Sequence, residues 1–251
     1  MSENSTDCEL TWRHDWAPHL FSFRTVRPAG LVFAPGQFVR LGLADADGTM
    51  VWRAYSIVSP PAADHLEFYS IVVPDGPFTQ PLAGLAVGDV VRIDPTVYGF
   101  LRTDRFEGGC DLWLLATGTG IAPFMSMLAD DAVWRRFERI VVIHSVRRAS
   151  ELVYRDDLSA WARSAPCGAR PLVYLPTLTA EPGPLTGRIT TLLADGGLER
   201  AAGLALSSDD SRLMICGNPS MIKETRVLLG ARGMTPVRRE TPGHYISENF
   251  W

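Results

Sequence analysis

The sequence predicts two domains of different class, a small antiparallel β-barrel or sandwich followed by a parallel α/β sheet. In the first part of the chain, short apolar runs are separated by Pro and Gly turns, which is typical of small all-β domains. In the second part, near-continuous apolar runs alternate with helical patterns, as expected for parallel strands buried on both faces. A length of 251 residues allows two domains, which we expect at 1–106 and 107–251.

The composition is that of a globular protein, with 46% hydrophobic and 21% charged residues. A net charge of −4 provides no basic excess to neutralise phosphates, so we expect no nucleic-acid partner. The four cysteines and five histidines are scattered, without the spacing of a disulfide framework, an iron–sulfur centre or a metal site. We therefore expect no bound metal.

The beginning of the chain is polar and acidic and lacks the basic and apolar regions of a signal peptide. No apolar run is long enough to span a membrane. These two features predict a cytoplasmic protein without a membrane partner.

Several strands of the first domain are predicted from period-two alternation between turn residues. They are expected at residues 20–23, 37–41, 66–73 and 89–93. One short helix is expected at 79–85, after the turn that contains Gly76. Its first backbone N–H groups, near Phe78 and Thr79, form a place that favours an anion, although an ordinary capped turn is the alternative.

Residues 53–56 have the sequence Arg-Ala-Tyr-Ser at the start of an apolar strand. Arg53 and Tyr55 share one side of this strand, because successive side chains point to opposite faces. A guanidinium suits a phosphate and an aromatic ring suits a flat heterocycle, so the pair is able to hold a phosphate-bearing planar cofactor. A strand with a surface arginine and a half-buried tyrosine is the alternative.

The second domain is predicted to open with a βαβ unit. A strand at 112–116 precedes a Gly-rich turn, helical segments at 124–128 and 131–137 follow, and a second strand lies at 140–144. Gly118 and Gly120 allow the backbone to approach a diphosphate closely. Pro123 stands where the dinucleotide fingerprint has its third glycine, a position that a proline near the helix start tolerates.

Two further parallel strands are expected at 172–175 and 213–216. After the second of these, Asn218 and Pro219 are expected to be the N-cap and first residue of a helix that ends near residue 229. Cys216 would lie at the carboxyl end of a strand, where ligands bind in open α/β sheets. A small buried packing residue is the alternative interpretation of Cys216. Arg147 and Arg148 follow the second strand and suit a 2′-phosphate, unless they are simply solvated.

Four motifs follow one another in the chain. They are Arg-x-Tyr-Ser at 53–56, Gly-x-x-Thr at 76–79, Gly-Thr-Gly-Ile-Ala-Pro at 118–123 and Cys-Gly-Asn-Pro at 216–219. In this order they resemble the ferredoxin/flavodoxin–NADP reductases, most closely the short bacterial type, from about residue 12 to residue 251. The resemblance implies a six-stranded antiparallel barrel that holds FAD and a five-stranded parallel sheet that holds NADP(H). It also implies ferredoxin or flavodoxin as partner and a monomeric protein.

The resemblance also implies a set of site residues. FAD would be bound by Arg53, Ala54, Tyr55, Ser56, Tyr69, Ser70, Ile71, Gly76, Phe78, Thr79, Phe250 and Trp251. NADP(H) would be bound by Gly118, Thr119, Gly120, Arg147 and Arg188, with Thr119 bordering both cofactors. The catalytic residues would be Ser56, Cys216, Glu248 and Phe250. Phe250 would cover the flavin ring and must move for the nicotinamide to stack, so the C-terminus is expected to be a gate.

The chain departs from the family pattern at Ala180. Family members have an arginine at this position, after the third strand of the NADP domain, whereas residues 177–181 here are Thr-Leu-Thr-Ala-Glu. We therefore expect NADPH to be preferred over NADH by a smaller margin. The alternatives are an NADH-preferring reductase component of an oxygenase, a flavin reductase, or a non-catalytic flavin module of a larger complex.

Overall fold

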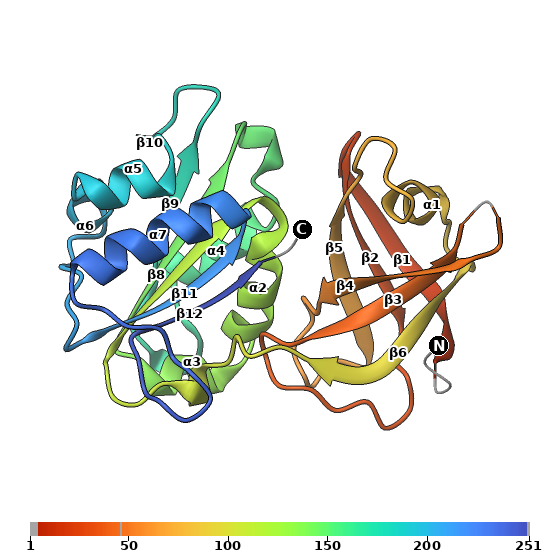
Figure 1. The fold of residues 1–251 in the computed structure, drawn as a ribbon, viewed down its shortest axis with the longest axis horizontal. Helices are drawn as coiled ribbons and strands as arrows, with labels where there is room; N and C mark the ends of the chain where they lie inside the picture. The colour runs from red at the N-terminus through yellow and green to blue at the C-terminus, as the bar shows by residue number, and fades with distance from the viewer. Residues whose placement is uncertain (1–4, 46, 250–251) are drawn as a thin grey trace. The chain divides into compact units, whose positions relative to one another are not determined.

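The computed structural model describes residues 5–45 and 47–249, which form two compact units (Figure 1). The N-terminal unit contains the described residues up to Gly99 together with Ala122–Ala129. The C-terminal unit contains Phe100–Ile121 and the described residues from Asp130 onward.

The N-terminal unit is built on six antiparallel strands in the order β4-β3-β6-β1-β2-β5, which confirms the predicted strand number and direction. The strands are β1 (Thr6–Ala17), β2 (Leu20–Val26), β3 (Phe38–Ala44), β4 (Met50–Ser56), β5 (His65–Ile71) and β6 (Val90–Tyr98). Helix α1 (Thr79–Gly84) is the short helix that the sequence predicts. It is held to β1 by Arg13, whose Nη1 donates to the carbonyl oxygens of Ala83 and Leu85, both at 2.7 Å.

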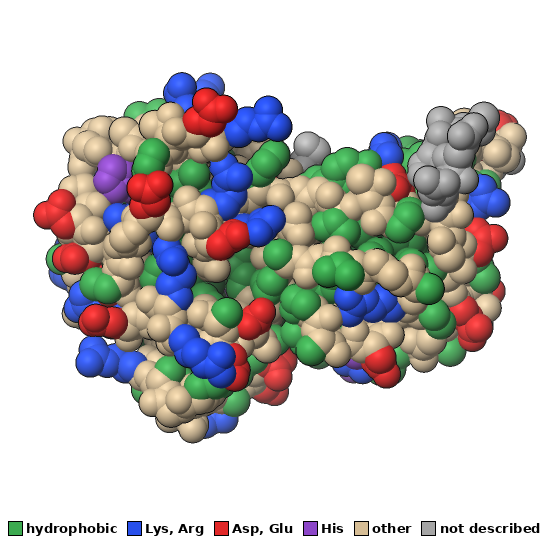
Figure 2. Space-filling view, turned by 90° about the horizontal axis from the view of Figure 1, so that it is seen from below, with side chains coloured by type: hydrophobic (Ala, Val, Ile, Leu, Met, Phe, Trp, Pro, Cys, Tyr) green, Lys and Arg blue, Asp and Glu red, His purple; other side chains and the backbone are tan. Residues whose placement is uncertain are grey.

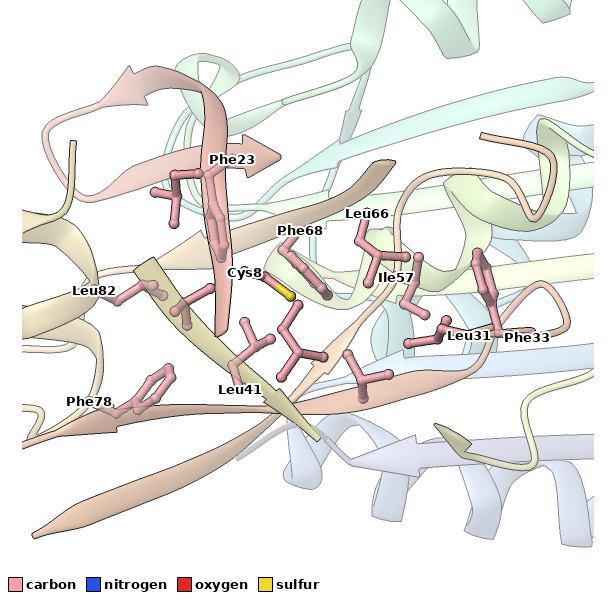
Figure 3. Close-up of a cluster of buried hydrophobic side chains, with 14 of the residues drawn as sticks. Cys8, Phe23, Leu31, Phe33, Leu41, Ile57, Leu66, Phe68, Phe78 and Leu82 are labelled. Atoms are coloured by element: carbon pink, nitrogen blue, oxygen red, sulfur yellow. The ribbon is translucent and has the colours of Figure 1, made fainter. Parts of the chain in front are cut away.

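Alternating side chains of these strands point inward and form one apolar core (Figure 3). Phe23, Leu66 and Phe68 are fully buried at its centre, and the rings of Phe23 and Phe68 lie 5.3 Å apart. Helix α1 contributes Leu82 to the same core. Because removing a buried phenylalanine side chain costs about 3–5 kcal/mol, this core fixes the strands that carry the predicted flavin residues.

The C-terminal unit contains a parallel sheet in the order β10-β9-β8-β7-β11-β12. The strands are β7 (Asp111–Thr117), β8 (Arg139–Val146), β9 (Val173–Leu178), β10 (Leu185–Thr186), β11 (Ser211–Gly217) and β12 (Tyr245–Asn249). The implied number of five strands is therefore wrong, because the sheet has six. The two edge strands are the ones that periodicity detects poorly: β10 has only two residues, and β12 is short and polar toward its end.

Helices and short 3₁₀ turns connect the parallel strands (Figure 1). The α-helices are α2 (Ala122–Leu128), α3 (Asp131–Arg136), α4 (Arg155–Arg163), α5 (Ile189–Ala194), α6 (Gly197–Ala202) and α7 (Pro219–Ala231). The 3₁₀ turns are η1 (Thr103–Arg105), η2 (Gly118–Ile121), η3 (Ala149–Glu151) and η4 (Pro166–Gly168). As predicted, Asn218 caps α7: its side chain accepts hydrogen bonds from the N–H groups of Ser220 and Met221.

Helices α5, α6 and α7 pack on the sheet through one shared apolar core. Leu193 of α5, Leu198 of α6 and Ile222 of α7 belong to the same buried cluster as Trp113 of β7 and Ile215 of β11. This packing fixes the carboxyl ends of the strands, where the predicted coenzyme residues lie.

The surface mixes charges of both signs. On the face drawn in Figure 2, Lys and Arg side chains are interspersed with Asp and Glu, in line with the net charge of −4. In the part of the chain that the structure describes, no helix is long and apolar enough to cross a membrane.

Candidate functional site

The Arg-Ala-Tyr-Ser sequence ends strand β4. Tyr55 pairs with Val39 of β3, which sets the strand's register. Arg53 and Ala54 are exposed, Tyr55 is half-buried and Ser56 is buried. Among the described residues, the guanidinium of Arg53 donates only to its neighbour, the Trp52 carbonyl oxygen, at 2.8 Å, which leaves its other N–H groups available to an anion.

Tyr55 is held rigidly by its neighbours. Its hydroxyl lies 2.9 Å from the Ser70 hydroxyl on β5, and its ring lies 5.7 Å from the ring of Phe78. Burial raises the pKa of Tyr55 to about 12, although the bond to Ser70 opposes this shift. The phenol is therefore neutral at physiological pH, and the structure brings together four residues of the predicted flavin site: Tyr55, Ser70, Phe78 and the adjacent Ser56.

Ser56 has an unusual environment for a hydroxyl. It is only 7% exposed, and its Oγ has no hydrogen-bond partner among the residues that the structure describes. Tyr69 and Ser70 of β5 are also buried, and Ile71 is half-buried at the end of that strand. A buried hydroxyl without a partner costs about 1–3 kcal/mol, which a ligand that bonds to Ser56 would recover.

The turn before α1 is compact. The Thr79 hydroxyl accepts the Val73 N–H at 3.0 Å, and a Cβ added to Gly76 would lie 2.5 Å from that hydroxyl oxygen. Glycine is therefore required at position 76. The Thr79 hydroxyl also donates to the Val73 carbonyl oxygen at 3.4 Å, so the turn uses it both as acceptor and as donor. A phosphate at this place would therefore be bound by backbone N–H groups.

The Gly-rich turn follows β7 and forms η2 (Gly118–Ile121). Gly118 has a φ of +53°, whereas a Cβ on Gly120 would lie 2.4 Å from the Cys216 carbonyl oxygen. The two glycines thus have different functions: Gly118 allows the turn, and Gly120 allows contact with the end of β11. Thr119 is half-buried between them.

Two residues that the sequence did not identify anchor this turn. The Thr117 hydroxyl accepts the Asn218 N–H at 2.8 Å, which joins the ends of β7 and β11. His144 on β8 is fully buried, and its Nε2 lies 3.0 Å from the Gly118 carbonyl oxygen. The sequence held only a weak signal: His144 is a polar residue at the end of the predicted apolar strand 140–144, and its partner Gly118 is 26 residues away.

Arg147 and Ala180 lie beside each other at the carboxyl ends of β8 and β9, since the Ala180 N–H donates to the Arg147 carbonyl oxygen at 2.9 Å. Glu181 accepts the Ala149 N–H at 2.7 Å and pairs with Arg148 at 3.8 Å. The Arg147 side chain is exposed and makes no ion pair with any described residue.

Arg188 follows the edge strand β10, which is in register with the end of β9. The preceding residue, Gly187, donates from its N–H to the Leu178 carbonyl oxygen at 3.0 Å, which keeps this segment near residue 180. Arg188 is exposed, and no ion pair is seen for it within the described ranges. Two of the predicted phosphate-binding arginines, 147 and 188, thus lie on the segments that flank Ala180.

Cys216 and Glu248 are register partners on β11 and β12. Cys216 is fully buried, and burial, together with the nearby Glu248, raises the pKa of its thiol well above the usual range. Glu248 Oε1 accepts the N–H groups of Phe100 and Leu101 at 2.6 and 3.2 Å. Burial nevertheless raises the pKa of Glu248, and its Oε2 has no partner in the described structure. The Cys216 thiol is therefore neutral, whereas Glu248 has one carboxylate oxygen without a partner among the described residues.

The predicted residues Phe250 and Trp251 lie outside the described residues. Asn249, the last described residue, ends β12 and pairs with Gly217 of β11.

The fold and the two groups of residues define a two-domain oxidoreductase. Residues 13–99 match the family model "Oxidoreductase FAD-binding domain", and residues 114–227 match the model "Oxidoreductase NAD-binding domain". The order of these two matches is the order of the two units in the chain.

The chain is similar over nearly its whole length to named reductases. It is 42% identical to the ferredoxin–NADP reductase of Pseudomonas aeruginosa, over 94% of this chain and 93% of that protein. It is 38% identical to the flavodoxin/ferredoxin–NADP reductase of Escherichia coli, over 97% of both. A crystal structure of a ferredoxin–NADP⁺ reductase from Neisseria gonorrhoeae with bound FAD and NADP superposes with a TM-score of 0.92, at 36% identity, and covers 98% of this chain and 99% of that one. The chain belongs to the bacterial ferredoxin/flavodoxin–NADP reductase family, which confirms the resemblance seen in the motifs.

Proposed function

We propose that this protein exchanges electrons between NADP(H) and ferredoxin or flavodoxin through bound FAD. The observation that carries this proposal is the 42% identity to a ferredoxin–NADP reductase along 94% of the chain. Bound FAD supplies the step between two-electron hydride chemistry and one-electron transfer, and the protein residues bind, orient and shield the reacting groups.

In the N-terminal unit we propose that FAD is held by the predicted residues of β4, β5 and the α1 turn. The unpartnered Ser56 hydroxyl supports this fit, because it offers a buried polar contact that no described side chain uses. Tyr55, fixed by Ser70 and Phe78, presents a flat ring with little freedom to lose on binding. Arg53 is exposed and makes no ion pair with a described residue, so its guanidinium could bind a phosphate.

In the C-terminal unit we propose that NADP(H) binds over the Gly118–Gly120 turn, with its 2′-phosphate near Arg147 and Arg188. The support is the close approach at Gly120 and the absence of an ion pair at either arginine within the described structure. Cys216 would contact the nicotinamide as a neutral group, and Glu248 would handle a proton through Oε2. We also propose that Phe250 and Trp251 form a gate over the flavin.

Ala180 is the specific observation in favour of a second candidate, an NADH-preferring reductase. One charged hydrogen-bonding contact contributes about 1.5–3 kcal/mol. Its absence therefore lowers the preference for NADPH over NADH by about ten- to hundredfold. Because Arg147 and Arg188 remain free of ion pairs to described residues, we propose that NADPH is still preferred, by a reduced margin.

We further propose a cytoplasmic monomer, with FAD bound by residues 1–106 and NADP(H) by 107–251. The names of the relatives include both ferredoxin and flavodoxin, and we propose both as electron carriers here. Size-exclusion chromatography with light scattering tests the monomer, and a stable dimer would contradict it.

The test of the function is stopped-flow reduction of the purified protein by NADPH and NADH, followed by transfer to purified ferredoxin and flavodoxin. A yellow protein that NADPH reduces faster than NADH, and that then reduces a carrier, is the expected result. A colourless protein would refute the FAD assignment, and faster reduction by NADH would favour the second candidate. A flavin that is reduced only inside a larger complex would indicate a subunit module.

A further inference from the structure

His144 lies directly beneath the Gly-rich turn at the carboxyl end of β8. Its Nε2 is 3.0 Å from the carbonyl oxygen of Gly118, and its side chain is fully buried. In the sheet it is the register partner of Ala116 on one side and of Pro176 on the other. Neither neighbour offers a polar side chain, so the bond to Gly118 is the polar contact that orients the ring.

The protonation state of His144 follows from this geometry. A carbonyl oxygen only accepts, so Nε2 must be the protonated nitrogen. The other nitrogen, Nδ1, is buried and has no hydrogen-bond partner among the described residues. The ring is thus a neutral imidazole with a proton on Nε2, the tautomer that donates to the turn.

The turn is otherwise held at its two ends. Before it, the Thr117 hydroxyl accepts the Asn218 N–H at 2.8 Å; after it, Gly120 lies against the Cys216 carbonyl. Between these points Gly118 has a φ of +53° and no atom within 4 Å of the position of a Cβ. The bond from His144 to the Gly118 carbonyl oxygen is therefore the side-chain contact that fixes the orientation of the Gly118–Thr119 peptide.

We propose that His144 is a positioning residue for the coenzyme diphosphate. By holding the Gly118 carbonyl toward the sheet, it directs the N–H of the same peptide, that of Thr119, away from the sheet and toward the ligand. This inference rests on the proposed function, because it deepens the assignment of the Gly118–Gly120 turn to NADP(H). Since the diphosphate is common to both coenzymes, His144 affects NADPH and NADH alike.

The test compares His144→Gln with His144→Asn. The amide nitrogen of glutamine can take the place of Nε2, whereas that of asparagine corresponds to Nδ1 and cannot reach Gly118. We expect His144→Asn to raise the Kd for NADP⁺ and the KM for NADPH and NADH by about three- to tenfold, the effect of one hydrogen bond. His144→Gln should stay within about twofold of the natural protein. The kcat and the flavin content should not change.

Three results would overturn the inference: an unchanged Kd in His144→Asn, an equal loss in both variants, or a loss confined to NADPH. The natural protein is measured first. If it does not bind NADP⁺, the proposed function itself fails; if it binds NADP⁺ and His144→Asn binds equally well, only the positioning inference fails.

A second measurement needs no variant. Nitrogen NMR of the natural holoenzyme with labelled histidine distinguishes the two neutral tautomers, and the His144 signal is identified by its absence in His144→Gln. A proton on Nε2, with a signal that shifts when NADP⁺ is added, is the expected result. A proton on Nδ1, or a signal that NADP⁺ leaves unmoved, would contradict the inference even if His144→Asn does not fold.

Discussion

His144 should make the protein acid-sensitive, and replacing it with glutamine should remove that sensitivity. Burial lowers the pKa of His144 from 6.5 to about 4, although its bond to the Gly118 carbonyl opposes the shift. Between these two values the unfolded chain binds a proton on this residue and the folded chain does not. The free energy of unfolding therefore falls as the pH drops from 6.5 toward 4, and this contribution is fully lost below pH 4.

The size of this effect on the free energy of unfolding follows from the pKa shift of His144. A difference of about 2.5 pKa units corresponds to a total of about 3 kcal/mol, at 1.36 kcal/mol per unit. Between pH 7 and pH 5 alone, His144 should lower the free energy of unfolding by about 2 kcal/mol. His144→Gln keeps a donor for Gly118 but does not titrate, so it isolates this term.

The assay is urea unfolding followed by circular dichroism at pH 7 and pH 5, for the natural protein and for His144→Gln. The other histidines and the carboxylates are present in both proteins and cancel in the comparison. The natural protein should lose about 2 kcal/mol more than the variant over this range. Equal losses in the two proteins would show that His144 titrates normally, and the reasoning about its burial would be refuted.

Three other predictions concern the site directly. Ala180→Arg should raise the ratio of kcat/KM for NADPH over NADH about ten- to hundredfold, and an unchanged ratio would contradict the position assigned to the 2′-phosphate. Ser56→Ala should leave FAD bound but slow flavin reduction about tenfold or more in stopped flow, since it removes a hydroxyl that no described residue uses; an unchanged rate would remove Ser56 from the reaction. Gly118→Ala should lower the free energy of unfolding by about 1 kcal/mol, from its positive φ, whereas Gly120→Ala should lower it by about 3 kcal/mol because its Cβ would meet the Cys216 carbonyl. Denaturant midpoints check this order, and equal losses would contradict it.

Much of the fold could be predicted because several helices and strands have clear local sequence patterns. The buried strand β7 is an uninterrupted apolar run, and the Asn218–Pro219 start of α7 has both an N-cap and a proline at the first position. Strand β10 could not be predicted in this way, because two residues have no periodicity. It forms only because the chain returns beside β9, a pairing that depends on the tertiary structure.

The residues of the candidate site also differ in whether a local sequence pattern indicates them. The sequence indicates Tyr55 and Ser56 as candidates because aromatic and hydroxyl groups on one strand have an evident chemical use, and Gly118 because glycines mark a tight turn. Thr117 and His144 were not identified, since their importance depends on partners 101 and 26 residues away in the sequence. The motif at 76–79 draws attention to the hydroxyl of Thr79 as a ligand-binding group. In the structure that hydroxyl is already hydrogen-bonded to Val73 within the turn.

Two of the buried polar atoms that the fold leaves without partners belong to residues of the two proposed ligand sites. Most buried polar groups in proteins are hydrogen-bonded, and each exception requires a reason. Within the described residues, Ser56 Oγ in the N-terminal unit and Glu248 Oε2 in the C-terminal unit are two of seven such exceptions; the others are on Thr25, Trp113, His144, Tyr174 and Thr177. Ser56 and Glu248 are the two that the motifs and the family resemblance assign to the reaction. An unpaired buried oxygen does not stabilise the folded protein. We propose that the ligands of the electron-transfer reaction complete the hydrogen bonds of these two atoms.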